Sequence, residues 1–99
     1  MSNNKEIFNL IRRRRRQVLF HSFLYYVMDI NMIDDSTWSV WAEELEVLQR
    51  DYPDIAEEVE MNNEFKGFDH STGANLVYDT PETEWVYSEY KLLKGNGYL

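Results

Sequence analysis

The chain contains no cysteine, which excludes disulfide bonds, iron–sulfur clusters and cysteine-ligated zinc. Histidine is scarce too, because only His21 and His70 offer imidazole, and they lie far apart without a recognisable ligand motif. We therefore expect no metal site. The lack of cysteine also fits a reducing compartment, so a cytoplasmic location is our expectation.

Long hydrophobic runs are missing as well. The mostly apolar stretch of residues 18–28 is well short of the ~20 residues that a membrane-spanning helix requires. It follows a basic stretch, as in a secretory signal, but it ends at Asp29 without a small-residue cleavage site. We expect neither membrane insertion nor export.

Basic residues are a minority, with 10 against 18 acids and a net charge of −8. This balance argues against ordinary duplex binding, which relies on many phosphate-neutralising cations. The charge is also uneven: residues 1–20 carry six basic groups and one acid, whereas residues 21–99 carry four basic groups and seventeen acids. An acidic protein of this kind suits docking on a basic surface.

What is present favours one mostly α-helical domain over residues 1–99. Hydrophobic residues make up 43% of the chain, enough for a packed core. No proline interrupts residues 1–52, and we predict a helix over residues 5–28. A second helix begins at the capping residues Asp34, Asp35 or Ser36. Its apolar residues step by three and four and share one face: Trp38, Trp41, Leu45, Leu48 and Tyr52.

Proline and glycine mark the remaining elements. Pro53 ends the second helix and opens a short third one, to about Met61. Residues 62–80 are expected to be irregular but pinned to the core, with a possible small hairpin through residues 71–73; Asp69 and Ser71 would bond local backbone there. Thr80 is a candidate cap for a last helix over residues 81–94, with Pro81 at its first position.

Two stretches of residues resemble the small N-terminal domain of bacterial NAD-dependent DNA ligases. Residues 23–29 read Phe-Leu-Tyr-Tyr-Val-Met-Asp, against a family pattern of Tyr-x-Tyr-(Tyr/His)-x-x-Asp. Residues 33–39 read Ile-Asp-Asp-Ser-Thr-Trp-Ser, against Ile-x-Asp-x-x-Tyr-Asp, and Leu45, Leu48 and Pro53 follow in register. The resemblance implies a ligase-like helical hairpin over residues 5–52.

In those ligases the hairpin holds the nicotinamide mononucleotide (NMN) half of NAD. The resemblance carries this role to Tyr25, Tyr26, Asp35, Trp38 and Ser39. Tyr25 and Trp38 would sandwich the cationic nicotinamide ring, Asp35 would accept from ribose hydroxyls, and an arginine would meet the phosphate. Trp38 stands where the family has Tyr, and Ser39 where it has Asp. From the residues alone, the three aromatic side chains are better explained as core at the hairpin joint, and only the resemblance makes a ring-binding pocket an equal alternative.

Catalysis is not expected. Ligases need a Lys-x-Asp-Gly nucleophile, and the nearest segment here, Lys66-Gly67-Phe68-Asp69, has the wrong spacing. The interpretation is a non-catalytic binding module that requires no cofactor and has NAD or NMN as a possible ligand. Small stand-alone relatives of this type resemble products of bacteriophages and mobile elements.

Two alternatives stay open. The first is a small acidic phage-encoded inhibitor of a host nucleic-acid enzyme or defence system, of the anti-CRISPR or a similar type, which acts by protein–protein contact. Its acidic face on the second helix would consist of solvent-facing Glu43, Glu44 and Glu46. A protein partner is thus expected ahead of nucleic acid, and the oligomeric state is left open.

The second alternative is a DNA-contacting accessory that uses the only basic cluster: Arg12, Arg13, Arg14, Arg15 and Arg16. Five consecutive helical residues cover ~500° around the axis, so they cannot all face one partner. We expect an arginine near Arg14 or Arg15 to lie on the apolar face, with its stem packed and its head paired.

Overall fold

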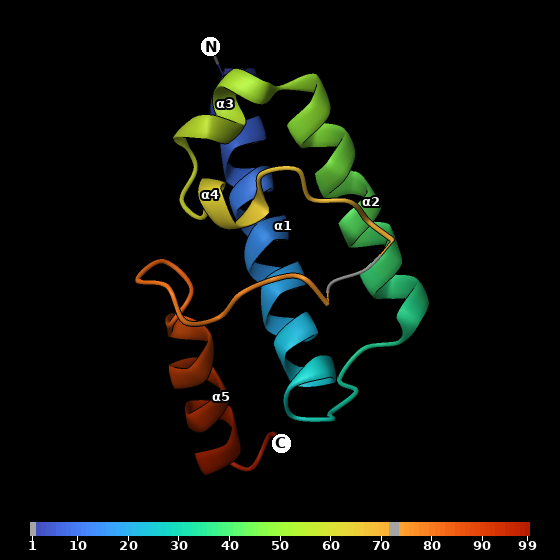
Figure 1. Cartoon of the computed structure of the whole chain (residues 1–99), viewed down its shortest axis with the longest axis vertical. Helices are drawn as coiled ribbons and strands as arrows, with labels where there is room; N and C mark the ends of the chain where they lie inside the picture. Colours follow the sequence, from blue (N-terminus) through green and yellow to red (C-terminus); the bar gives the residue numbers. More distant parts are fainter. Residues whose placement is uncertain (1, 72–73) are drawn as a thin grey trace.

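The computed structural model describes residues 2–71 and 74–99, and within these residues it consists of helices and connections without a β-strand. The prediction of a mostly α fold is therefore confirmed. Figure 1 shows the order of the elements. The helices are α1 (Ser2–Tyr26), α2 (Asp35–Asp51), α3 (Pro53–Glu58), α4 (Asn62–Phe65) and α5 (Trp85–Gly95).

Helices α1 and α2 lie side by side as an antiparallel hairpin, which confirms the predicted pair (Figure 1). Residues 27–34 connect them, with Asp29 in the left-handed region at φ 57°. Asp34 is the N-cap of α2, because its carboxylate accepts from the backbone N–H of Thr37 at 2.8 Å. This bond satisfies a backbone donor that the first helical turn would otherwise leave unpaired.

One hydrophobic core contains residues from all five helices. The predicted apolar face of α2 is confirmed at Leu45 and Leu48, which are buried, while Trp38 and Trp41 pack against the core with one side exposed. Tyr52 departs from that face. Its backbone leaves the helical region, with φ −130° and ψ 58°, so its side chain is 41% exposed.

Arg15 ties three elements together and is only 1% exposed. Its guanidinium donates to Gln49 Oε1 at 2.8 Å and to the carbonyls of Val59 and Glu60 at 3.0 and 3.1 Å. Burial lowers the pKa of Arg15 from 12.5 to about 10, so the group is still a cation at neutral pH. The predicted arginine on the apolar face is thus confirmed, with its head paired.

The third helix is shorter than predicted. It ends at Glu58, and Val59 is extended while Met61 is left-handed at φ 71°. The bend has a physical reason, since it buries both Val59 and Met61 almost completely. The chain then forms the single turn α4, inside a region that we expected to be irregular, and Phe65 there is fully buried.

The segment between α4 and α5 lies over the hairpin. Residues 66–71 cross from α4 to α2, and residues 74–80 return across α1 (Figure 1). The Ser71 N–H donates to Asp69 Oδ1 at 2.6 Å, which confirms the predicted local turn at these two residues. Thr72 and Gly73 of the possible hairpin lie outside the described residues.

Helix α5 begins at Trp85 rather than at Pro81. The Thr80 carbonyl accepts from the N–H groups of Thr83 and Glu84 at 3.0 and 2.9 Å, so residues 80–84 form tight turns. The Glu82 carboxylate accepts from the backbone N–H of Met61, and this long-range contact accounts for the turn that replaces a helical start. The helix ends at Gly95, one residue beyond the predicted end at residue 94.

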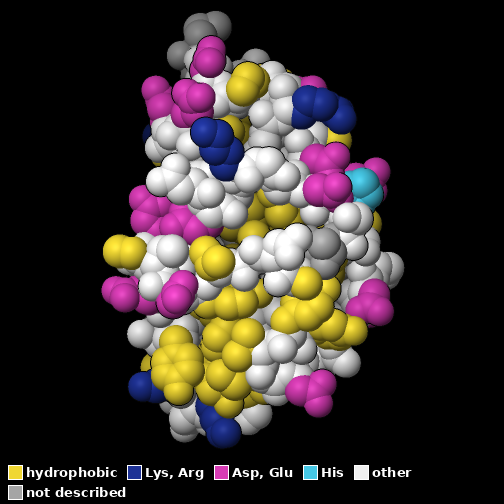
Figure 2. Space-filling model, in the orientation of Figure 1, with side chains coloured by type: hydrophobic (Ala, Val, Ile, Leu, Met, Phe, Trp, Pro, Cys, Tyr) yellow, Lys and Arg dark blue, Asp and Glu magenta, His cyan; other side chains and the backbone are white. Residues whose placement is uncertain are grey.

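Helix α5 packs against α1 through aromatic rings. Trp85 stacks on Phe20, with centroids 6.4 Å apart, and Tyr90 meets Phe23 edge-on at 6.0 Å. Apolar side chains also cover the outer surface around α5 in Figure 2, where Tyr87 is 49% exposed.

Candidate functional site

A cavity of about 230 Å³ lies at the joint of the hairpin, between the C-terminal end of α1 and the N-terminal end of α2. All five residues that the ligase resemblance assigns to a nucleotide line it: Tyr25, Tyr26, Asp35, Trp38 and Ser39. The other lining residues are His21, Ser22, Asp34 and the connecting residues 30–33. Side chains from two helices and their connection therefore converge on one hollow.

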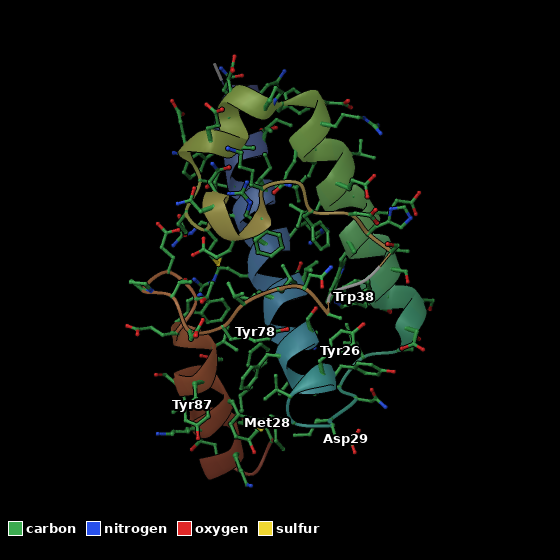
Figure 3. The ribbon with its side chains drawn as sticks, viewed as in Figure 1. Tyr26, Met28, Asp29, Trp38, Tyr78 and Tyr87 are labelled. Carbon is green, nitrogen blue, oxygen red and sulfur yellow. The ribbon has the colours of Figure 1, made fainter. Side chains whose placement is uncertain are left out.

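The aromatic walls of the cavity differ in how firmly they are held. Trp38 Nε1 donates to Ser22 Oγ at 3.1 Å, and Ser22 is fully buried, so the indole is fixed. Tyr25 and Tyr26 are 50% and 48% exposed and pack edge to face, with centroids 4.9 Å apart. Figure 3 shows Tyr26 and Trp38 on the same side of the hairpin. These exposures do not fit the alternative in which the tyrosines are core residues.

Two carboxylates stand at the α2 edge of the cavity. Asp34 accepts from Thr37 and also from Ser36 Oγ at 3.0 Å, and these hydrogen bonds hold the pKa of Asp34 below its usual value. Asp35 is exposed in the first turn of α2 and has no capping role. One aspartate therefore serves the helix, and the other presents its charge to the cavity.

Sequence reasoning missed His21 and Ser22 as cavity residues. The His21 ring lies near Trp41, with centroids 5.7 Å apart, and its Nδ1 is buried without a hydrogen-bond partner. Burial lowers the pKa of His21, so the ring is neutral at pH 7. A signal was present, because residues 21 and 25, and likewise 22 and 26, are four apart and so share a helix face.

The five arginines do not form one surface. Arg12 pairs with Glu60 at 2.5 Å, Arg14 pairs with Glu44 at 3.2 Å, and Arg16 lies over the Trp85 ring at 4.2 Å. Arg15 is buried, and among the described residues no partner is found for exposed Arg13. The prediction that an arginine meets a phosphate at the cavity is wrong for this structure, since none of the five lines it.

The expected acidic face of three solvent-facing glutamates on α2 is found only in part. Glu43 is exposed, but Glu44 is half-buried beside Arg14. Glu46 accepts from the backbone N–H of His70 at 2.7 Å and contacts His70 Nδ1 at 2.8 Å. The crossing segment that contains His70 packs on α2 and covers this acid, a contact that helical periodicity does not reveal.

Possible metal ligands gather at one place in the part of the chain that the structure describes. The donor atoms of Glu46, Asp69 and His70 lie within 4.8 Å of one another. Each already has a partner inside the group or beside it, because Glu46 bonds His70 and Asp69 accepts from Ser71. Glu46 and His70 therefore act as a tether between α2 and the crossing segment.

Comparisons with protein-family models, with curated proteins and with solved structures find no match. Within residues 2–71 and 74–99, no helix is long and apolar enough to cross a membrane. Because the comparisons find no match, function is inferred from the cavity at the hairpin joint.

Proposed function

We propose that this protein is a non-catalytic binding module whose ligand is a nicotinamide nucleotide, held in the cavity at the joint of α1 and α2. One observation carries the proposal. Five residues named from a sequence resemblance, two on α1 and three on α2, line the same hollow. Residues that serve only to pack the hairpin would not need to leave a cavity between them.

The chemistry of the lining suits a flat cationic ring joined to a sugar. A volume of about 230 Å³ is smaller than most cofactor sites, so the nicotinamide–ribose half fits better than a whole dinucleotide. The faces of Tyr25 and Trp38 attract a cationic ring through their quadrupoles. Asp35 offers acceptor oxygens to ribose hydroxyls.

The same lining supports binding without catalysis. It contains no lysine, so the nucleophile on which ligases form their adenylyl intermediate is lacking there. Incubation with radiolabelled NAD should leave no label on the denatured protein. We further propose a cytoplasmic location, where nicotinamide nucleotides occur.

Thermal melting with NMN, NAD and nicotinamide riboside tests the proposal. A ligand that binds only the native state raises the melting temperature, and at a hundred times Kd the gain is about 2.7 kcal/mol. Trp38→Ala should reduce the shift to about half, as a tenfold loss of affinity implies, whereas Trp41→Phe, which alters a tryptophan outside the cavity lining, should keep it in full. If none of these ligands shifts the wild-type melting temperature and calorimetry detects no heat, the proposal is wrong.

A second candidate function is the acidic inhibitor, for which α3 and α4 provide the better surface. Glu57, Glu58, Glu60 and Glu82 line a hollow of about 420 Å³. Acidic side chains stand at the end of the molecule where Figure 1 has α3 and α4 (Figure 2). Of these acids, Glu57, Glu58 and Glu82 are exposed, and Glu82 already accepts from the Met61 backbone. A basic protein surface would complement this charge.

The inhibitor proposal is tested with purified DNA-binding enzymes of the host as targets. Inhibition should weaken as salt rises, because exposed charges are screened over ~10 Å at 0.1 M. Glu57→Gln with Glu58→Gln should slow association, while Glu43→Gln serves as the control on α2. Unchanged association of the double variant would refute a role for the α3–α4 surface.

A further inference from the structure

We infer that the cavity selects its ligand by charge: it takes an N-ribosylated pyridinium cation that bears no phosphate, in preference to the phosphorylated and the reduced forms. This inference rests on the proposed function, in which the nicotinamide–ribose half of a nucleotide occupies the same cavity, and it narrows the preferred ligand to the nucleoside, with NMN as the weaker ligand. It departs from the expectation that an arginine would meet the phosphate of NMN.

The charges that line the cavity are all negative. Asp34 and Asp35 contribute carboxylates, and the lining includes neither lysine nor arginine. Burial lowers the pKa of His21, so its ring adds no positive charge to the lining at pH 7. A positive ring is therefore attracted, and a phosphate dianion is repelled.

The N-terminus of α2 does not reverse this balance. Helix N-termini commonly bind phosphate, because they present free N–H groups and a positive dipole end. Here the Asp34 carboxylate already accepts the Thr37 N–H at 2.8 Å, and Asp35 occupies the first turn. The Asp34 carboxylate thus takes a donor that a phosphate would need, and Asp35 adds a second negative charge beside it.

The nearby arginines are engaged elsewhere. Arg14 donates to Gln17 at 2.6 Å and pairs with Glu44, and its guanidinium lies 5.9 Å from the Trp41 ring. Arg15 is held in the core by backbone carbonyls. Recruiting either one to a phosphate would break contacts that hold α1 to its neighbours.

The aromatic side chains add a preference for the oxidised ring. Tyr25, Tyr26 and Trp38 line the cavity, and a pyridinium cation gains free energy by contact with an aromatic face. A reduced dihydropyridine is neutral, so it loses this attraction together with the attraction to Asp35. Shape alone would not separate the two forms, because they differ by a hydride.

The experiment compares nicotinamide riboside, NMN and reduced nicotinamide riboside by calorimetry at neutral pH and low ionic strength. Nicotinamide riboside should bind at least about fivefold more tightly than either of the others, as one unit-charge contact at a protein surface provides. Asp34→Asn with Asp35→Asn should bring the affinities for nicotinamide riboside and NMN close together, since asparagine still caps a helix without charge. Asp54→Asn on α3, an exposed aspartate outside the lining, should leave their ratio unchanged.

The outcomes separate the two proposals. If none of the three ligands binds, the proposed function fails, and this inference fails with it. If NMN binds as tightly as nicotinamide riboside or more tightly, nucleotide binding stands and charge selection is overturned. A ratio that is unchanged in the Asp34–Asp35 double variant, with melting showing that the variant is folded, overturns charge selection as well.

Discussion

Trp38 Nε1 donates a 3.1 Å hydrogen bond to Ser22 Oγ, and so fixes an α2 indole at the cavity to a fully buried hydroxyl of α1. The two residues link α1 to α2, and both line the cavity. Their hydrogen bond joins the two helices of the hairpin near their connection, and it fixes the indole that forms one aromatic wall of the cavity.

Two substitutions of Trp38 should separate its hydrogen bond to Ser22 from its ring contact with a ligand. Trp38→Phe keeps an aromatic face but leaves Ser22 without its partner, so the free energy of unfolding should fall by about 1 kcal/mol while ligand affinity falls little. Trp38→Ala also removes the face, and affinity for nicotinamide riboside should fall about tenfold. Urea unfolding and calorimetry measure the two effects, and equal affinities in both variants would rule out a ring contact.

Among the five consecutive arginines, substitution of Arg15 should lower the free energy of unfolding the most. Arg15→Ala removes the donors that satisfy the carbonyls of Val59 and Glu60, and we expect a loss of about 3 kcal/mol in the free energy of unfolding. Arg13→Ala, on the exposed side of the same helix, should change it by less than about 0.5 kcal/mol. Urea denaturation measures both, and similar losses would contradict the structural role of Arg15.

Tyr78 offers a stabilising substitution. Its hydroxyl is buried without a hydrogen-bond partner, and burial raises the pKa of Tyr78 to about 12. Its ring packs edge-on against Phe23 at 5.2 Å, a contact that phenylalanine preserves. Tyr78→Phe should therefore leave the free energy of unfolding unchanged or raise it by about 1 kcal/mol. Tyr87→Phe, at the exposed position seen in Figure 3, is the control and should have no effect.

The hairpin could be predicted because local rules determine it, whereas the residues assigned to the cavity came from the ligase resemblance. Apolar spacing specifies α1 and α2, Asp34 is a good cap, and a short connection forces the helices to pack antiparallel. The residues on either side of that connection must then converge, which is why Tyr25 and Trp38 share a cavity.

The parts that could not be predicted depend on contacts between distant residues. Glu82 binds the backbone of Met61, and α5 consequently begins at Trp85. The helical pattern alone predicts that Glu46 faces solvent, but the segment that contains His70 packs on it in the structure. Periodicity and capping rules describe one element at a time, so neither contact leaves a signal in the pattern.

The Glu46–His70 tether should respond to pH. Hydrogen bonding of its ring to Glu46 raises the pKa of His70 above 6.5. Hydrogen bonds from the His70 backbone N–H and from its ring lower the pKa of Glu46 below 4.5. The stabilisation that protonated His70 contributes is fully present below the unfolded pKa of 6.5. It is lost as pH rises through the pKa of His70 in the folded protein. The stabilisation that ionised Glu46 contributes is present above its unfolded pKa of 4.5. It is lost as pH falls through the pKa of Glu46 in the folded protein.

The tether is therefore strongest between roughly pH 4.5 and 6.5, where His70 is protonated and Glu46 is ionised. Amide hydrogen exchange at His70 should be slowest in this window, relative to the intrinsic rate at each pH, and its ring resonances should titrate above 6.5. His70→Gln should make protection of residues 66–71 independent of pH there, whereas Asp54→Asn should leave the profile intact. A His70 titration at or below 6.5 in the wild-type protein would show that the ion pair with Glu46 does not form in solution.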